Sequence, residues 1–264
     1  MQYKYFIGVD VSKMTLDICL LKSNTFVLHE KIDNTKESIQ AFLKKLKAEF
    51  KAVGRASLFC MENTGPYQNI LLPILLKKNA AVWVESPLRI KKSFGIQRGK
   101  SDKLDSIRIA QFAYLNRDNP RLWQEPRSEI RKLKQLCIIR ARVKRILIQL
   151  EVPAKEGSLF HIGKEPYQII KLCTGSLTAL KQDYKIISSA IEELINSDCH
   201  LRQLMGIITS VPGIGKLIAV ELIIVTNEFK NFSSANKLAS YCGVVPFEYS
   251  SGTTLKGKPH VSKI

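Results

Sequence analysis

The order of strand-like and helix-like segments in residues 1–122 limits the folds open to this chain. Three short segments rich in β-branched and aromatic residues come first, YKYFIGVDVSK, TLDICLLKS and TFVLHEKI, and that composition is typical of strands. Apolar residues at helical spacing, Ile39, Phe42 and Leu46 among them, then predict a helix in NTKESIQAFLKKLKAEF. Two further strands, ASLFCME and AAVWVES, alternate with helices in PYQNILLPILLKK, which must bend or restart at Pro73, and in SDKLDSIRIAQFAYL.

Three strands followed by alternating helices and strands are the order of elements in the α/β ribonuclease H-like fold. Other α/β domains also open with hairpins, so the order favours this fold without being unique to it. We therefore expect an N-terminal ribonuclease H-like domain over residues 1–122.

Two long helical patterns follow from about Ser128. The segment SEIRKLKQLCIIRARVKRILIQLE is amphipathic and very basic, and Pro153 is expected to end it. The segment SLTALKQDYKIISSAIEELINSDCHLRQLMGII predicts a second long helix, with Leu177 and Ile187 on one face. Two such helices most simply pack as an antiparallel hairpin, so residues 123–204 are expected to form a helical coiled-coil spacer.

The C-terminal part begins with SVPGIGKLIAVELI. Gly213 and Gly215, followed by Lys216 and an apolar helix, look like the turn of a helix-hairpin-helix, which offers backbone N–H groups to a phosphate. The same Pro-Gly-x-Gly pattern also occurs in ordinary helix connectors. Beyond it regular periodicity fades, and we expect residues 205–264 to form a small, mainly α C-terminal domain.

Four carboxylates stand out by their positions. Asp10 interrupts the apolar first strand, Glu62 ends the fourth, and Asp102 and Asp105 share one face at the start of a helix. In a ribonuclease H-like sheet the first and fourth strands are adjacent and the last helix crosses the same end, so all four acids should converge. Converging carboxylates repel one another, and Mg²⁺ or Mn²⁺ bound by their oxygens relieves that repulsion. Singly, each acid has a plainer explanation, Asp10 as a turn cap and the helix acids as complements to the helix dipole.

Basic side chains concentrate in the middle of the chain. The sequence has 41 Lys and Arg against 23 Asp and Glu, and residues 89–145 alone hold seventeen Lys or Arg against five Asp or Glu. A solvated helix face would mix the two signs more evenly, so the excess predicts a nucleic-acid partner. The residues expected to contact nucleic acid are Lys100, Lys103, Arg131, Arg140, Arg142, Arg145, Gly213, Gly215 and Lys216.

Composition sets the remaining bounds. With 45% hydrophobic and 24% charged residues the chain can bury a core and is not disordered. The six cysteines are scattered without a CxxC pair or a Cys/His cluster, which indicates reduced thiols and argues against a zinc site. No apolar run reaches transmembrane length and no signal-peptide pattern follows Met1, so we expect a cytoplasmic protein without a membrane partner.

Two blocks of motifs resemble a known family. GVDVSK, MENTGPY and KSDKLDSIRIAQFA resemble the metal-binding motifs of the Piv/MooV-type recombinases, the DEDD insertion-sequence transposases, and VPGIGKLIAVELI with FKNFSSANKLASYCGVVPFEYSSG and KGKPHVSK resembles their second conserved block. The resemblance implies a RuvC-like N-terminal domain, a coiled-coil spacer and a small C-terminal transposase domain. It implies that Asp10, Glu62, Asp102 and Asp105 are the catalytic metal ligands.

The resemblance also implies that a serine in PFEYSSG, Ser250 or Ser251, attacks DNA, and that a structured bridge RNA pairs with target and donor DNA. On local sequence alone both serines read as turn residues before Gly252. No histidine adjoins them, so the distant metal site would have to activate the hydroxyl when domains, or protomers of a homo-oligomer, meet. Family members usually continue with a Gly-Asn turn and an Arg-bearing helix, so a chain ending at Ile264 is expected to be truncated.

The sequence thus predicts an RNA-guided DNA transposase or site-specific recombinase that depends on Mg²⁺ or Mn²⁺. The first alternative is a metal-dependent RuvC-like endonuclease in which water attacks, since that chemistry needs only the four acids. The second is a non-catalytic nucleic-acid-binding remnant, which the expected truncation favours. The third is an actin-like phosphotransferase, because GVDVSK also resembles its phosphate-loop strand, although the sequence lacks a second Gly-rich loop and an adenosine-binding motif.

Overall fold

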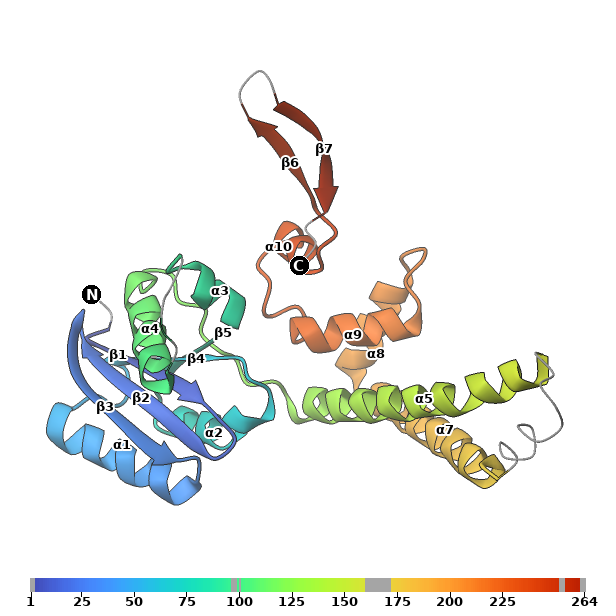
Figure 1. Ribbon diagram of the computed structural model, residues 1–264, viewed down its shortest axis with the longest axis horizontal. Helices are drawn as coiled ribbons and strands as arrows, with labels where there is room; N and C mark the ends of the chain where they lie inside the picture. Colours follow the sequence, from blue (N-terminus) through green and yellow to red (C-terminus); the bar gives the residue numbers. More distant parts are fainter. Residues whose placement is uncertain (1–2, 96–98, 100, 160–171, 252–254, 262–264) are drawn as a thin grey trace. The chain divides into compact units, whose positions relative to one another are not determined.

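The computed structural model describes the chain as two compact units, Met1–Gln124 and Glu125–Ile264, which we call the N-terminal and the C-terminal unit. The N-terminal unit is a five-stranded sheet with helices on both faces, and the C-terminal unit is mostly helical and ends in a two-stranded sheet (Figure 1). The residues that the structure describes are 3–95, 99, 101–159, 172–251 and 255–261.

The N-terminal unit follows the predicted order of elements. Its strands are β1 Tyr5–Val11, β2 Thr15–Lys22, β3 Thr25–Asp33, β4 Ser57–Glu62 and β5 Ala81–Glu85. Its helices are α1 Lys36–Phe50, the 3-10 helix η1 Pro66–Asn69, α2 Leu71–Lys77, α3 Pro87–Lys92 and α4 Asp102–Leu115. The strands lie in the order β3-β2-β1-β4-β5, with β1, β2 and β3 antiparallel and β4 and β5 parallel to β1. The ribonuclease H-like fold and the adjacency of β1 and β4 are confirmed.

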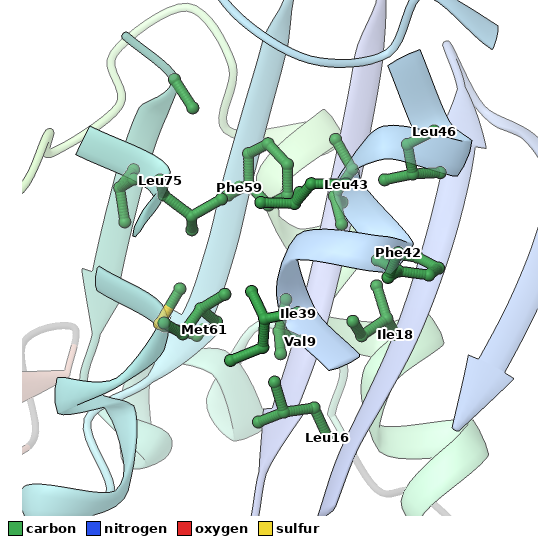
Figure 2. Close-up of a cluster of buried hydrophobic side chains, with 14 of the residues drawn as sticks. Val9, Leu16, Ile18, Ile39, Phe42, Leu43, Leu46, Phe59, Met61 and Leu75 are labelled. Atoms are coloured by element: carbon green, nitrogen blue, oxygen red, sulfur yellow. The ribbon is translucent and has the colours of Figure 1, made fainter. Parts of the chain in front are cut away.

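Apolar side chains fill both faces of this sheet, because successive residues of a strand point to opposite sides. One face packs against α1 and α2, with Phe59 near Leu43 and Val9 near Ile39 (Figure 2). The other face packs against α3 and α4, and its core includes Phe6 and the fully buried Trp83. Since the middle of each face is apolar, we expect polar side chains with a chemical role at the ends of the strands.

Gly8 sets how closely α4 approaches the sheet. A Cβ added at Gly8 would lie 2.1 Å from the carbonyl oxygen of Ser106 and 2.3 Å from the backbone nitrogen of Ala110. Both atoms belong to the helix backbone and cannot give way alone, so only glycine permits this crossing. One helical turn before Ser106 lies Asp102, and the close crossing therefore brings the start of α4 to the end of β1.

Two prolines behave differently from the sequence-based expectations. The restart expected at Pro73 occurs earlier, at Leu71, so Pro73 lies in the first turn of α2, where a missing N–H costs little. The helix expected to end at Pro153 continues to Leu159, and that expectation was wrong. Proline removes one helical hydrogen bond, but its φ is compatible with a helix, which can run through it with a local distortion.

The C-terminal unit consists of α5 Ser128–Leu159, α7 Thr174–Ser197, α8 Cys199–Thr209, α9 Lys216–Thr226, α10 Ala235–Tyr241, β6 Pro246–Ser251 and β7 Leu255–Val261. The helices α5 and α7 pack side by side as a hairpin (Figure 1). The second long helix that the sequence predicted is two helices, α7 and α8, because Asp198 leaves helical geometry and accepts a hydrogen bond from the Leu201 N–H as the N-cap of α8. The fading periodicity of the last segment did not predict β6 and β7. The boundaries of the three expected domains stay predictions.

A cluster of ion pairs ties the start of α5 to α8 and to the end of α9. The Arg127 guanidinium donates to Asp198 Oδ2 at 2.8 Å and to Glu228 Oε1 at 3.0 Å. The fully buried Glu228 side chain also accepts from Lys230 Nζ at 2.8 Å. Its backbone and those of both neighbours have positive φ, which is strained for non-glycine residues. The ion pairs offset this strain and avoid leaving a buried charge unpaired.

No helix in the described ranges is long and apolar enough to cross a membrane.

Candidate active site

Five charged residues form one row across the N-terminal sheet. The antiparallel registers pair Lys31 of β3 with Asp17 of β2, and Asp17 with Asp10 of β1. In the parallel pairing of β1 with β4, Asp10 and Glu62 directly follow the paired residues Val9 and Met61. Glu62 in turn pairs with Glu85 of β5. Positions paired across neighbouring strands face the same side of a sheet, and this side is the one that α4 covers. We call Lys31, Asp17, Asp10, Glu62 and Glu85 the carboxylate row.

Positive and hydrogen-bonding groups satisfy one end of the row. The buried Glu85 accepts from Trp83 Nε1 at 3.1 Å and from the Ser86 N–H at 2.9 Å, and it forms an ion pair with Arg89. The Arg89 guanidinium also lies 5.7 Å from the Trp83 ring centroid, within cation–π range. A buried carboxylate with three partners is fixed in place, so we assign Glu85 to the structure of the strand ends.

The opposite end of the row is satisfied in the same manner. Asp17 is buried, and its Oδ1 lies 3.0 Å from His29 Nε2 while its Oδ2 lies 3.2 Å from Lys31 Nζ. The carboxylates of Asp17 and Asp102 raise the pKa of Lys31 by accepting hydrogen bonds from its ammonium. Lys31 therefore stays protonated as the cation of this end of the row.

Asp10, at the centre of the row, is half-buried among negative charges. Its pKa is raised to about 6, first by burial and then by the carboxylates of Asp102, Glu62, Asp105 and Asp17. Burial and like charges both disfavour the ionised form. Several carboxylates close together attract a divalent cation. Its positive charge lowers the pKa values that the neighbouring negative charges raise.

The acids of α4 stand at the start of the helix, where Ser101 provides the N-cap. Each has a cationic neighbour: Asp102 Oδ2 lies 3.3 Å from Lys31 Nζ, and Asp105 Oδ1 accepts from Arg108 Nη1 at 2.9 Å. Asp102 is the more exposed of the two, with 63% of its side chain accessible against 27% for Asp105. Both acids are thus held by basic side chains while they remain within electrostatic reach of Asp10.

The donor set fits a hard divalent metal ion, but it is not preassembled. Among the described residues, no three His, Cys, Asp or Glu side chains already stand together as a metal-binding group. Instead, Lys31 forms an ion pair with Asp102, and Arg108 forms one with Asp105. Carboxylate oxygens are the ligands that Mg²⁺ and Mn²⁺ prefer, and burial together with the neighbouring carboxylates raises the pKa of Asp10. The acids whose oxygens could hold such an ion are Asp10, Glu62, Asp102 and Asp105.

The predicted nucleophiles lie in the other unit. Ser250 and Ser251 belong to β6, where they pair in the backbone register with Lys256 and Leu255 of β7. The structure therefore gives them strand positions, whereas local sequence suggested a turn. Their side chains and Gly252 lie outside the described residues.

The basic residues expected to bind nucleic acid are mostly exposed. Arg142 and Arg145 of α5 are exposed and Arg140 is half-buried. Arg131 is exposed but pairs with Glu125, at 2.6 Å between Nη1 and Oε1. Lys103 is exposed on α4, and Lys100 lies outside the described residues.

The glycine turn joins two helices, as its pattern predicted. Gly213 has a φ of 88° between α8 and α9, and Gly215 is the N-cap residue of α9. Lys216 Nζ forms an ion pair with Glu192 Oε1 at 3.0 Å. A Cβ added at either glycine would meet no atom within 4 Å, so no other group packs against the backbone at these two positions.

Sequence reasoning missed four residues of this site: Gly8, Asp17, Lys31 and Glu85. Asp17 and Glu85 interrupt apolar strands just as Asp10 does, and this was the available signal. Their membership of one row follows only from the strand registers, which a single sequence does not specify.

The sheet order and the carboxylate row define the class of ribonuclease H-like enzymes with an acidic site. Residues 7–151 match the IS110-type DEDD transposase family, described as "Transposase", and residues 205–264 match the family described as "Transposase IS116/IS110/IS902 family". The chain belongs to the IS110 family of transposases. It is accordingly a DNA recombinase or transposase, and its class uses a divalent metal and binds DNA.

Curated relatives support this membership. The chain is 30% identical over 255 residues to the pilin gene-inverting protein of Moraxella lacunata, a match covering 96% of this chain and 75% of that protein. The pilin gene-inverting protein of Moraxella bovis is 29% identical over the same shares. A 43.6 kDa insertion element IS110 protein of Streptomyces coelicolor is 32% identical over 90 residues, which cover 34% of this chain and 21% of that one.

Among solved structures, Thermus thermophilus RuvC in complex with a Holliday junction substrate matches 44% of this chain and 97% of its own. The sequence identity is 12% and the TM-score is 0.35. A second RuvC structure from Thermus thermophilus matches 44% of this chain and 96% of its own, with 11% identity and a TM-score of 0.34.

Proposed function

We propose that this transposase cuts and rejoins DNA at the carboxylate row, with Mg²⁺ or Mn²⁺ held by Asp10, Glu62, Asp102 and Asp105. The observation that carries the proposal is the adjacency of Asp10 and Glu62 at the end of β1 and β4, under the start of α4. Such ions, when bound there, would stabilise the attacking and the leaving oxygen of a phosphodiester.

The residues of the chain prepare this chemistry. Gly8 lets α4 lie close enough to bring Asp102 and Asp105 to the row. The ion pairs at Glu85 and Asp17 hold the outer strands without using the central acids. Asp10 would act in its ionised form, which a bound divalent cation favours. A rigid row and a movable pair of helix acids are suited to binding a cation and a phosphate together.

A serine nucleophile fits the need to rejoin strands. The names of the Moraxella relatives state that they invert a pilin gene, and inversion of a DNA segment requires rejoining as well as cutting. The Oγ of Ser250 or Ser251 would form a bond to phosphorus while the bond from phosphorus to a deoxyribose oxygen breaks. The serine proton is lost and the released sugar oxygen gains a proton. The phosphoserine ester conserves the bond energy, and the reverse step reseals the strand.

We extend the proposal to a guide RNA and to a homo-oligomer. The exposed Arg142 and Arg145 on α5, in a segment with a large excess of basic residues, support a long nucleic-acid surface. Such a surface suits a structured RNA as well as duplex DNA. Recombination acts on more than one DNA strand, and several protomers would supply the required number of sites.

A second candidate is a nuclease in which water attacks the phosphodiester. The four acids all lie in the N-terminal unit, whereas Ser250 and Ser251 lie in the C-terminal unit. A metal site contained in one unit can hydrolyse DNA without a serine. The two candidates differ in whether a covalent protein–DNA intermediate forms.

The experiment is a trapping assay with a nicked DNA substrate that loses its leaving strand after cleavage. With Mg²⁺ present, we expect a protein–DNA adduct that survives a denaturing gel, and peptide mapping should place it in the segment containing EYSSG. The double variant Ser250→Ala, Ser251→Ala should lose the adduct, because no other hydroxyl is expected to attack. Ser240→Ala in α10 is the matched control, since it removes an exposed serine hydroxyl outside this strand.

Efficient cleavage without an adduct, or an undiminished adduct in the double variant, would exclude the serine mechanism. Cleavage without an adduct would leave the water-dependent nuclease in its place, whereas an undiminished adduct in the double variant would assign the covalent bond to another residue.

A further inference from the structure

Lys31 links two carboxylates that belong to different layers of the N-terminal unit. Its Nζ lies 3.2 Å from Asp17 Oδ2 on the sheet and 3.3 Å from Asp102 Oδ2 on α4. One ammonium therefore bridges an end of the carboxylate row to a predicted metal ligand on the covering helix.

The two ion pairs of Lys31 differ in how much it costs to break them. Asp17 has only 6% of its side chain exposed, and His29 holds its other oxygen. Losing the lysine would leave this buried carboxylate with less compensation, so the contact is costly to break. Asp102 is 63% exposed and can rotate into water at little cost. The lysine is thus anchored on the sheet, while the helix acid is the partner that can leave.

Arg108 holds the other helix acid in a different manner. Its guanidinium pairs with Asp105 from the same helix, three residues away. This ion pair lies within α4, whereas the two ion pairs of Lys31 join α4 to β2 and β3 of the sheet.

We propose that Lys31 is a positioning residue of the metal site: it holds Asp102 against the carboxylate row in the metal-free protein and yields that carboxylate to a divalent cation. The inference rests on the proposed function, because it takes Asp102 as a metal ligand. Lysine suits this role because its ammonium is a compact charge on a flexible stem. A divalent cation has the same sign and needs the same oxygen, so the two compete.

The competition has a measurable consequence for metal affinity. Replacing Lys31 by a neutral residue removes one positive charge near the cation and frees Asp102 from its ion pair. Both changes favour the cation, and Lys31→Gln should tighten Mn²⁺ binding by about 3- to 10-fold at low ionic strength. Lys31→Arg retains the charge and should stay within about twofold of the unchanged protein. High salt should shrink the difference, because it screens the competing charge.

The measurement is a titration of the full metal-free chain with Mn²⁺, with the free ion followed by electron paramagnetic resonance. Lys45→Gln is the matched control, because Lys45 Nζ also pairs with a β3 acid, Glu30 Oε2 at 2.6 Å. Glu30 pairs in register with Ile18, so it faces away from the carboxylate row. This control should leave Mn²⁺ affinity unchanged.

A second measurement needs no variant. The rate at which an amine reagent acetylates Lys31 in the folded protein can be followed by mass spectrometry with and without Mn²⁺. Release from Asp102 should make the Lys31 amine several-fold more reactive when Mn²⁺ is bound, and Lys45 should not change.

Unchanged or weaker Mn²⁺ binding by a folded Lys31→Gln protein would overturn the inference, as would a Lys31 acetylation rate that ignores Mn²⁺. If Asp10→Asn abolishes Mn²⁺ binding while Lys31→Gln has no effect, only the role of Lys31 fails. If the unchanged protein binds no Mn²⁺, the proposed metal site fails together with it.

Discussion

Asp10 shows how one residue can reveal a site. A carboxylate in an apolar strand is expensive to bury, and here other carboxylates add to the effect of burial in raising its pKa. The sequence pointed to Asp10 and Glu62 through this anomaly. It did not point to Asp17 or Glu85, which are equally anomalous, because their buried ion pairs and their shared row depend on strand registers.

The raised pKa of Asp10 predicts how the metal-free protein responds to pH. The folded state favours protonated Asp10, because its surroundings raise the pKa of this carboxyl from its ordinary value of 3.8 to about 6. Its contribution to the free energy of unfolding is therefore fully present below pH ~4 and is lost as the pH rises through about 6. Asp10→Asn should raise the stability of the metal-free protein by about 1 kcal/mol near pH ~7.5, after a discount for solvent screening. The difference should vanish near pH ~4.

Thermal melts of both proteins with chelator present would measure this effect. If Asp10→Asn is less stable than the unchanged protein at neutral pH, other groups already neutralise the charge of Asp10 in the metal-free protein.

The elements were largely predictable because their periodicities are strong. The three strands and the alternating helices followed from composition and order, and the adjacency of β1 and β4 followed from the fold that this order favours. The missed boundaries have local causes that compete with periodicity. Asp198 interrupts a continuous helical pattern because its side chain caps the next helix, and Pro153 lies within α5 although its ring removes a hydrogen bond.

The crossing of α4 over β1 gives a test of how elements position the acids. Gly8→Ala should lower the free energy of unfolding by about 1–3 kcal/mol, because the new methyl group would overlap the α4 backbone. Displacement of the start of α4 should also weaken metal binding. Denaturant unfolding and a Mn²⁺ titration would measure the two effects.

Gly206→Ala is the control for this change. Gly206 lies inside α8 with nothing within 4 Å of an added Cβ, so alanine should be neutral or stabilising by up to about 1 kcal/mol. Equal effects of the two substitutions would show that α4 does not need the close approach at Gly8.

Across the chain, the proposed chemistry is divided between two units. The acids lie in the N-terminal unit, and the basic helix α5 and the serines of β6 lie in the C-terminal unit. Sequence reasoning predicted both parts, because the acids stood out by position and the basic residues by number. The serines were identified by resemblance, since a hydroxyl beside a glycine has no distinctive local signal.

The basic surface of α5 predicts a salt-dependent affinity for nucleic acid. Reversing Arg140, Arg142 and Arg145 to Glu should weaken binding and reduce the slope of log affinity against log salt by about 2–3, at about 0.9 per lost contact on duplex DNA. Filter binding at several salt concentrations would measure the slope. A control reversal of three exposed lysines of the N-terminal unit should leave the slope nearly unchanged; these are Lys44, Lys47 and Lys77. An unaltered slope in the α5 variant would mean that nucleic acid binds elsewhere.

The most direct test of the metal site locates the metal itself. Fe²⁺ can replace Mg²⁺ at carboxylate sites, and with ascorbate and peroxide it generates radicals that cut the polypeptide next to the bound ion. We expect cuts at three places far apart in the sequence, near Asp10, Glu62 and Asp102–Asp105, all suppressed by excess Mg²⁺ and by Glu62→Gln. Cuts elsewhere, or no cuts in a protein with an intact melting curve, would contradict the assignment of these four acids as one metal site.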